Sequence, residues 1–418
     1  MTGSIEATDC DLFAQVMDYA NRANPYPLYA QLRKTPVVRA DDGLYLVSRY
    51  DEIRSLLFHP KVSSNVVQRL RYPRTGNLFA DWIMNPIKER IAHRYRSLLL
   101  RDPPEHDALR RQVMRQFTPE RMQRMKGRAT VIIDELITRM QGRRQFDLVE
   151  AFAYPLPVAI ICELLGVPAQ DEQKFHAWSK SLIAGLDPKY LTEAEVHKLA
   201  VDRAAISVYL SALIKEKRRR PTDDVLTGLA TCRDKKAGRL NHFDLIATAV
   251  SLLVAGHEST VCLITNGMLT LLRQPEILAR LRLDPDLAPR LVEELLRFDS
   301  PAQLVRRKAD DDIDIAGVRI PKGAMMVLLL ASGNRDPKRF TDPDRFDPDR
   351  KNNQNFGFGA GLHACLGAWL AKMETEAALL ALSRRLINPS LAEDPPPYRS
   401  TAALRGPECL LINIEGVA

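Results

Sequence analysis

The stretch "FGFGAGLHACLG", residues 356–367, combines four glycines with one histidine and one cysteine, directly before a strongly helical run. A dinucleotide-binding loop would require G-x-G-x-x-G after an apolar strand. Here the polar "KNNQN" precedes the loop, and the glycines at 357, 359 and 361 have a different spacing. A dinucleotide site is therefore excluded. A metal site, a nucleophile and a cofactor ligand remain as interpretations of Cys365.

Cys365 is explained better as a cofactor ligand than as a nucleophile. A cysteine nucleophile needs a basic partner, and His363, two residues away, is a weak candidate. Haem is a large flat ring, so a cysteine that reaches its iron must bring the backbone close to it. Glycines at 359, 361 and 367 allow that approach and turns with positive φ. Because the following helix would stabilise a thiolate, we favour a haem ligand, with a nucleophile as the alternative.

Two side chains near Cys365 fit the same interpretation. Phe358 precedes the cysteine by seven residues and would shield its sulfur from water. His363 would hydrogen-bond a carboxylate of the haem. The loop is therefore expected to supply an iron ligand, an apolar cover and a donor for the edge of the ring.

The composition of the chain is that of a large globular protein. It has 418 residues, of which 45% are hydrophobic and 27% charged, which allows a substantial core. The six cysteines form no C-x-x-C pair, so a disulfide framework and a zinc knuckle are poor interpretations. The first residues lack a charged and apolar leader, and we expect a cytoplasmic protein.

Charge and hydropathy argue against nucleic-acid and membrane functions. The net charge of +8 comes without a nucleic-acid motif, so we expect no nucleic-acid partner, although an acidic protein remains a possible one. The segment from Leu245 to Leu272 contains only His257 and Glu258 among acidic and basic residues. It exceeds the length of a membrane span, but a glutamate near its middle would be costly in lipid. A buried helix is therefore favoured, and no membrane.

Hydrophobic patterns predict a mostly α protein with small β sheets. Strands are expected beside Asp42-Gly43, a favoured hairpin turn pair, and around Gly317. Helical patterns dominate the remainder. Because no linker or repeat divides the chain, we expect one large domain over 1–418, with a small β-rich part at about 25–60 packed on it.

The cysteine loop also resembles that of a known family. F-G-x-G-x-H-x-C-x-G at 358–367 is similar to the haem-binding loop of the cytochrome P-450 superfamily, soluble bacterial type. "AGHEST" at 255–260 resembles the family's oxygen-activation sequence, A-G-x-[D/E]-T-[T/S], and "DPPEHDALRR" at 102–111 resembles its H-x-x-x-R helix. "EELLR" and "DPDRF" resemble its E-x-x-R and arginine motifs. The resemblance runs from about residue 25 to the end.

This resemblance implies the fold and the cofactor. A P-450-type domain would hold haem b between the long central helix (about 243–273) and the helix after the cysteine loop (about 366–386). Cys365 would be the axial ligand of the iron. Four basic side chains would pair with the two propionates, namely His106, Arg110, Arg307 and His363. The other residues expected at the ring are Ala255, Phe358, Gly359 and Gly367.

The resemblance also divides the remaining motif residues into catalytic and structural ones. Glu258 and Ser259 would deliver the protons that the reduction of dioxygen requires. The family usually has Thr where this chain has Ser259, and serine lacks the methyl group that restricts χ1. Glu294, Arg297 and Arg345 would form a buried structural cluster.

A monooxygenase is the activity that the resemblance implies. It would insert one oxygen atom of O2 into a small, largely apolar organic substrate, in a pocket that includes Ala255, Leu304 and Val305. The alternatives are a haem-thiolate enzyme of another reaction type, such as a peroxygenase, an isomerase or a carbon–carbon coupling enzyme, and a non-catalytic haem-binding protein.

The electrons for this reaction are expected from other proteins. The chain contains no flavin or nicotinamide fingerprint, and the resemblance implies a ferredoxin and a ferredoxin reductase as donors. Basic residues are candidates for the docking surface, namely Arg111, Arg115 and Lys372.

Overall fold

The computed structural model describes residues 9–40, 43–66, 97–185, 191–234 and 238–418. The chain forms two compact units: the first comprises Met1–Val66, Ile133–Ala153 and Ser259–Ala418, and the second comprises Val67–Ile132 and Tyr154–Glu258. Two helices run through both units, α6 (Pro119–Thr138) and α11 (His242–Arg273). The single domain over 1–418 stays a prediction.

The first unit contains a five-stranded sheet whose strands come from distant parts of the sequence. Its order is β1 (Val37–Arg39), β2 (Tyr45–Val47), β10 (Met325–Leu328), β7 (Val305–Ala309) and β3 (Val62–Ser63). The hairpin expected beside Asp42-Gly43 forms between β1 and β2, while residues 41–42 lie outside the described chain. β2 then pairs in parallel with β10, with Leu46 opposite Val327. The β-rich part at 25–60 is therefore completed by strands from 305–328.

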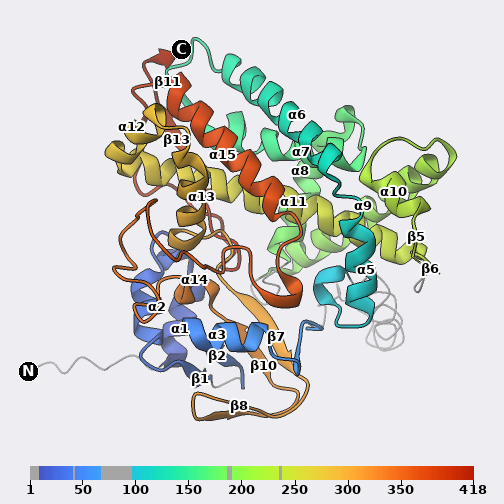
Figure 1. Cartoon of the computed structure of the whole chain (residues 1–418), viewed down its shortest axis with the longest axis vertical. Coiled ribbons are helices and arrows are strands. Elements are labelled where there is room, and N and C mark those ends of the chain that lie inside the picture. Colours follow the sequence, from blue (N-terminus) through green and yellow to red (C-terminus); the bar gives the residue numbers. More distant parts are fainter. Residues whose placement is uncertain (1–8, 41–42, 67–96, 186–190, 235–237) are drawn as a thin grey trace, which may run out of the picture. The chain divides into compact units, whose positions relative to one another are not determined.

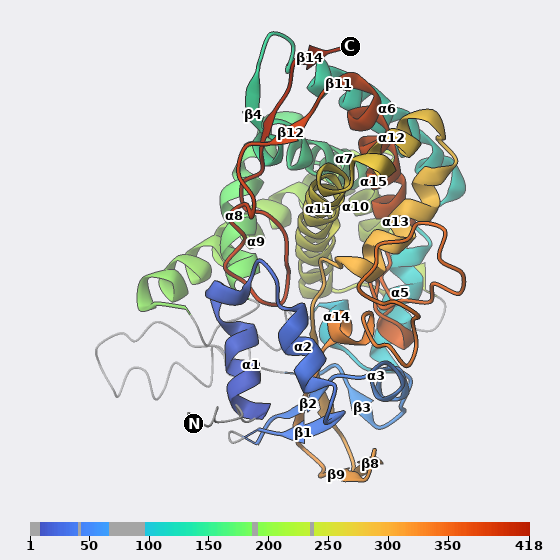
Figure 2. The ribbon, with the colours of Figure 1, turned by 90° about the vertical axis from the view of Figure 1, so that its left-hand side faces the viewer.

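Helices from both ends of the chain cover this unit. Figure 2 shows the N-terminal helices beside β1 and β2; they are α1 (Asp9–Met17), α2 (Tyr26–Leu32) and α3 (Tyr50–Leu57). Leu12, Tyr29 and Leu46 share one apolar cluster, which fixes α1 and α2 to the sheet. In Figure 1 the C-terminal helix α15 (Ala368–Arg385) runs beside α12 (Pro275–Leu283) and α13 (Leu287–Phe298), and α14 (Leu330–Gly333) lies nearer the sheet.

Short strand pairs complete the first unit. The strands expected around Gly317 form the hairpin of β8 (Ile313–Ile315) and β9 (Val318–Ile320), where Gly317 has a φ of +78°. A three-stranded sheet has the order β12 (Ser390–Leu391), β13 (Leu411–Asn413) and β4 (Gln145–Asp147). A two-stranded sheet consists of β11 (Leu386–Ile387) and β14 (Gly416–Val417).

The described residues of the second unit are mostly helical. Besides parts of α6 and α11, they form α5 (Glu105–Met114), α7 (Pro155–Leu165), α8 (Glu172–Ala184), α9 (Glu193–Arg219) and α10 (Val225–Thr231), together with a small hairpin of β5 (Arg233–Asp234) and β6 (Gly238–Arg239). Local sequence sets the ends of these helices. Thr192 and Glu195 form a capping box at the start of α9, and Gly166 ends α7 with a φ of +72°.

The two long helices lie where the sequence predicted them. α11 spans His242–Arg273 and α15 spans Ala368–Arg385, against the predicted 243–273 and 366–386. Within the described residues α11 alone is long and apolar enough to cross a membrane, and 61% of its most apolar window is buried. Core helices of soluble proteins meet the same criterion, so this is weak evidence for a membrane span. The mostly α fold with small sheets is confirmed.

Candidate functional site

Two glycines of the cysteine loop let it approach neighbouring helices closely. A Cβ atom on Gly357 would lie 2.7 Å from Cβ of Leu296 on α13. A Cβ atom on Gly361 would collide with the carbonyl oxygen of Leu57 at the end of α3, and Gly361 has a φ of +70°. Larger residues at either position would push the loop off its support. The role of Gly357 was not predicted from the sequence, and Gly361 was expected to approach a ring, whereas the structure places it against α3.

The other two glycines leave open space beside the loop. No atom lies within 4 Å of a Cβ atom placed on Gly367, and the nearest to one on Gly359 is the carbonyl oxygen of His363 at 3.8 Å. Gly359 has the expected positive φ of +66°, whereas Gly367 has a φ of −89° just before α15. The positive φ expected at Gly367 is therefore wrong. Gly367 therefore contributes open space beside the loop and not an unusual backbone conformation.

Cys365 presents an exposed thiol from this loop. Its backbone N–H donates a hydrogen bond to the carbonyl oxygen of Phe358 at 3.0 Å, which closes the loop, and its side chain is exposed. The Phe358 ring is half-buried, with Nζ of Lys372 at 5.6 Å from its centre. His363 is half-buried at the end of a single 3-10 turn, Gly361–His363.

Other cysteines are less suited than Cys365 to bind a metal ion or to act as a nucleophile. None of the five cysteines whose side chains are described is in a disulfide bond, and Cys162 and Cys262 are buried. Burial raises the pKa of the Cys162 thiol to about 12, with smaller contributions from Glu172 and Asp171. Burial also raises the pKa of Cys409 to about 11. A thiolate is therefore disfavoured at both positions.

A buried ion-pair network fixes the segment that precedes the cysteine loop. Glu294 and Arg297 on α13 are both 0% exposed, and the guanidinium of Arg297 donates to the two carboxylate oxygens of Glu294 at 2.8 and 2.7 Å. Arg297 also donates to the carbonyl oxygens of Asn334 and Pro343. Such a network fixes the segment 339–352, because each charge has its partners in place.

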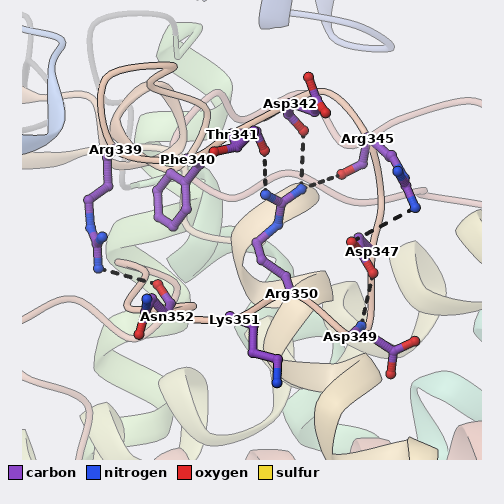
Figure 3. Close-up of a pocket in the computed structure, with 10 residues that line it drawn as sticks. All are labelled: Arg339, Phe340, Thr341, Asp342, Arg345, Asp347, Asp349, Arg350, Lys351 and Asn352. Carbon is purple, nitrogen blue, oxygen red and sulfur yellow. Dashed lines mark hydrogen bonds and ion pairs between the residues drawn. The ribbon is translucent and has the colours of Figure 1, made fainter.

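The third member of this network is Arg350, so the prediction for Arg345 is wrong. Nε of Arg350 lies 3.1 Å from Oε1 of Glu294. The side chain of Arg345 is 70% exposed and pairs at 4.0 Å with Asp347 (Figure 3). The sequence reads "DPDRFDPDR" at 342–350, so the same four-residue pattern occurs twice, and the sequence alone does not distinguish the two arginines.

A pocket of about 360 Å³ lies in the same segment (Figure 3). Its walls come from residues 339–352 and are mostly charged. Arg350 crosses it to reach the carbonyl oxygens of Asp342 and Arg345, at 3.1 and 2.9 Å. Of the predicted site residues, only Arg345 lines this pocket, which therefore belongs to the structural network.

Asn334 and Tyr50 connect this network to the start of the cysteine loop. The side chain of Asn334 donates to the carbonyl oxygen of Leu296 at 3.3 Å and accepts from the backbone N–H of Phe356 at 2.7 Å. Tyr50 on α3 stacks on the Phe356 ring at 4.4 Å and donates to the carbonyl oxygen of Gln354 at 3.0 Å. The loop is thus held from two sides before it reaches Cys365.

His106 and Arg110 lie one turn apart on α5 in the second unit. His106 is buried, and its Nδ1 lies 2.9 Å from Oδ1 of Asp107. Arg110 is half-buried, and no described residue forms a hydrogen bond or ion pair with its guanidinium. A partly buried cation of this kind suits an anionic group that comes from outside the protein.

The oxygen-activation sequence lies in the middle of α11. Ala255 is exposed and Ser259, one turn later, is half-buried, although this helix is mostly buried. Glu258 is 3% exposed, and its Oε1 lies 3.4 Å from Nε2 of the buried His257. The pair that His257 forms with Glu258 was not predicted from the sequence, because neighbouring residues on a helix do not ordinarily face each other.

Three further predicted site residues are Arg307 and Val305 on β7 and Leu304 directly before it. Arg307 lies opposite Met326 of β10 and is half-buried; its Nη1 donates to the carbonyl oxygen of Arg306 at 2.8 Å. Successive strand residues point to opposite faces, so Arg306 and Arg307 do not share one. Leu304, expected in a substrate pocket, packs instead in the apolar core cluster of the first unit. Val305 is half-buried against a second core cluster.

The cysteine loop of the first unit fits haem b, because it offers an exposed thiol and open space at Gly359 and Gly367. The second unit separately offers Arg110, a half-buried arginine with no partner among the described residues. Cys365 and Arg307 belong to the first unit, and Arg110 belongs to the second. Their joint action on one ring therefore stays a prediction.

Comparisons with known proteins give the same family throughout. The model of the family "Cytochrome P450" matches residues 72–404. Cytochrome P450 107B1 of Saccharopolyspora erythraea is 36% identical over 417 residues, which cover 96% of this chain and 95% of that protein. Vitamin D(3) 25-hydroxylase of Pseudonocardia autotrophica is 37% identical over 392 residues, which cover 92% of each chain.

A solved structure agrees with these sequence matches. The ligand-free crystal structure of Mycobacterium smegmatis CYP164A2 superposes with a TM-score of 0.85 and 38% sequence identity, covering 96% of this chain and 99% of that one. Family members bind haem b, iron protoporphyrin IX, through a cysteine thiolate. The chain therefore belongs to the cytochrome P450 family and is a haem-thiolate oxidoreductase of the monooxygenase type.

Proposed function

We propose that this P450 hydroxylates a small, largely apolar organic molecule, with Cys365 as the thiolate ligand of its haem. The observation that carries this proposal is the exposed Cys365 thiol on a loop with open space at Gly359 and Gly367. A relative is named a vitamin D(3) 25-hydroxylase, which supports hydroxylation of an apolar substrate. We place the enzyme in the cytoplasm, where a thiol is kept reduced.

The chain's own residues have separable tasks in this proposal. The bound haem supplies the activation of O2. Cys365 donates electron density through Sγ. The haem carboxylates are bound by four basic side chains, namely His106, Arg110, Arg307 and His363. Glu258 holds a proton at its carboxyl group, and the Ser259 hydroxyl passes protons on through water. Exposed Ala255, one turn from Ser259, leaves room beside them.

The visible spectrum of the dithionite-reduced protein, before and after carbon monoxide, tests the ligand. We expect a Soret band at the long-wavelength position of a thiolate–carbonyl complex. It should be lost in Cys365→Ser and retained in Cys409→Ser, a half-buried cysteine outside the loop. A short-wavelength band in the wild type would show a neutral ligand. The absence of any Soret band in folded protein would overturn the haem assignment.

For electron supply we propose a ferredoxin and a ferredoxin reductase. Arg111, on α5, and Arg115, directly after that helix, are exposed, and such a face suits an acidic partner. Lys372 is less suited, because it already pairs with Glu293. With a surrogate ferredoxin and reductase, NAD(P)H consumption should fall with rising salt and in Arg111→Glu. A peroxide-driven enzyme would form product from peroxide yet show no dependence on the ferredoxin.

A further inference from the structure

A buried histidine lies next to Glu258, and the proposed function does not use it. His257 is 0% exposed, and its Nδ1 lies 2.6 Å from the carbonyl oxygen of Leu253, one turn earlier on α11. A carbonyl oxygen only accepts hydrogen bonds, so Nδ1 carries a hydrogen. The ring orientation and the Nδ1 proton are thereby fixed, and only Nε2 can gain or lose a proton.

Nε2 of His257 faces the carboxyl group of Glu258. The distance to Oε1 is 3.4 Å, and no described residue forms a hydrogen bond with Nε2. A bare Nε2 and an ionised carboxylate are both acceptors, and two buried acceptors face to face with no proton between them are unfavourable. One proton removes this conflict, whether it resides on Nε2 or on the carboxyl group.

Close packing keeps the histidine in place. A Cβ atom on Gly256 would lie 2.8 Å from Cδ1 of Ile161 on α7, so α11 and α7 are in tight contact at this point. The His257 ring itself is 0% exposed, and its hydrogen bond to Leu253 opposes rotation away from Glu258.

Other titratable groups near His257 come from two further elements. The ring of Tyr154, just before α7, meets the His257 ring edge-on with 5.8 Å between centres. Behind Tyr154 lies the exposed ring of His176 on α8, with 4.3 Å between those centres. Glu258 and Tyr154 thus face His257, and the exposed His176 contacts Tyr154.

We propose that His257 is a positioning residue that shares one proton with Glu258 and so keeps that proton stored at the oxygen-activation sequence. The inference rests on the proposed function, in which Glu258 supplies protons. The pair releases one proton from the Glu258 carboxyl group and takes one proton from water to return to its starting state. No electrons are exchanged and no covalent bond other than those to hydrogen changes.

Spectroscopy of the resting pair tests this inference independently of turnover. In the carbon monoxide-bound ferrous holoenzyme, 15N-histidine NMR reports the protonation of Nε2, with the His257 signal assigned by its loss in His257→Gln. Infrared difference spectra between wild type and Glu258→Gln report a protonated carboxyl group. One shared proton predicts one of these two signatures. Both together, or neither, would overturn the proposal, and the infrared arm does not depend on the folding of His257→Gln.

The pH profile provides a second readout that a purely structural role would not move. With surrogate ferredoxin and reductase and no substrate, we measure electron consumption from about pH 6 to about pH 9. His257→Gln should shift the alkaline limb to lower pH and reduce the rate there by about tenfold. The control is His242→Gln, on the same helix, whose ring contacts Ser211. A His257→Gln profile identical to that of the wild type would refute the shared proton. Failure of the proposed haem ligand is a separate outcome, because it appears as a short-wavelength Soret band in the carbon monoxide spectrum.

Discussion

Two glutamates on neighbouring helices of the first unit have the same depth and opposite surroundings. Glu294 on α13 is 0% exposed, and its oxygens accept hydrogen bonds from Arg297, Arg350, Asn353 and the backbone N–H of Asp347. Glu374 on α15 is 1% exposed, and its Oε2 has no hydrogen-bond partner among the described residues. Burial raises the pKa of Glu374 well above its ordinary value.

The contrast shows that donors, and not depth, decide whether a buried carboxyl group is charged. Glu294 accepts hydrogen bonds from cationic and N–H donors, so it fixes the chain around it. Glu374 has no donor at Oε2 among the described residues, so its burial disfavours the charged form. The first is therefore a fixed structural charge, while the second makes stability depend on pH.

The largest expected effect follows from removing the main partner of Glu294. Arg297→Leu leaves a buried carboxylate without its bidentate donor and should lower the free energy of unfolding by about 3–5 kcal/mol. Guanidinium unfolding of the holoenzyme, followed by circular dichroism, measures it. Arg297→Lys should restore only part of the loss, because lysine cannot donate in a fork. A loss below about 1 kcal/mol would show that Glu294 has other sufficient partners.

A smaller effect separates the two arginines of "DPDRFDPDR". Arg350→Ala removes a donor to Glu294 and to backbone carbonyl oxygens, so we expect a loss of about 1.5–3 kcal/mol. Arg345→Ala, at an exposed side chain, should change stability by less than about 0.5 kcal/mol. The same unfolding assay serves for both variants. Equal losses would show that Arg345 supports the buried Glu294 as much as Arg350 does.

Glu374 should make stability fall as pH rises. Its folded pKa is raised by burial, so its stabilising effect is complete below the unfolded pKa of about 4.3 and is lost as pH rises towards the folded pKa. Over that window the slope is at most about 1.4 kcal/mol per pH unit. Glu374→Gln should remove this slope, and Glu376→Gln, at a half-buried position on the same helix, should retain it. Parallel stability curves for wild type and Glu374→Gln would refute a neutral Glu374.

The smallest effect is expected at the surface, where α13 and α15 are linked by an ion pair. Glu293 and Lys372 are 40% and 33% exposed, and such pairs contribute at most about 1 kcal/mol. Lys372→Ala should therefore lower stability by less than that, and the difference should diminish in high salt. A loss as large as that of Arg350→Ala would mean that the exposed fraction does not predict how much an ion pair between α13 and α15 contributes to stability.

The sequence predicted the local parts of this fold well. The hairpin of β1 and β2 follows from a favoured turn pair, and α11 and α15 follow from long hydrophobic patterns. The parallel pairing of β2 with β10 was not predicted, because the partners are far apart in sequence and no turn connects them directly. Their pairing depends on the assembled core.

The candidate site was predicted where a motif fixes a residue, and missed where packing selects one. The spacing of Glu294 and Arg297 places them on one helix face, and the structure pairs them. The sequence around Glu374 reads "KMETEA", and that pattern does not show which of two glutamates is buried. Similarly, Leu304 is apolar enough for either a pocket or a core, and only the assembled cluster assigns it to the core.

The glycines of the cysteine loop determine where a mutagenesis library can vary it. At 357 and 361 any side chain meets α13 or α3, so diversity there would mostly yield misfolded clones. At 367 a Cβ atom meets nothing and φ is ordinary, so small residues can be sampled without loss of fold. A directed-evolution campaign on this enzyme would therefore gain most by fixing the first two positions and screening the third for changes in how the ring is seated.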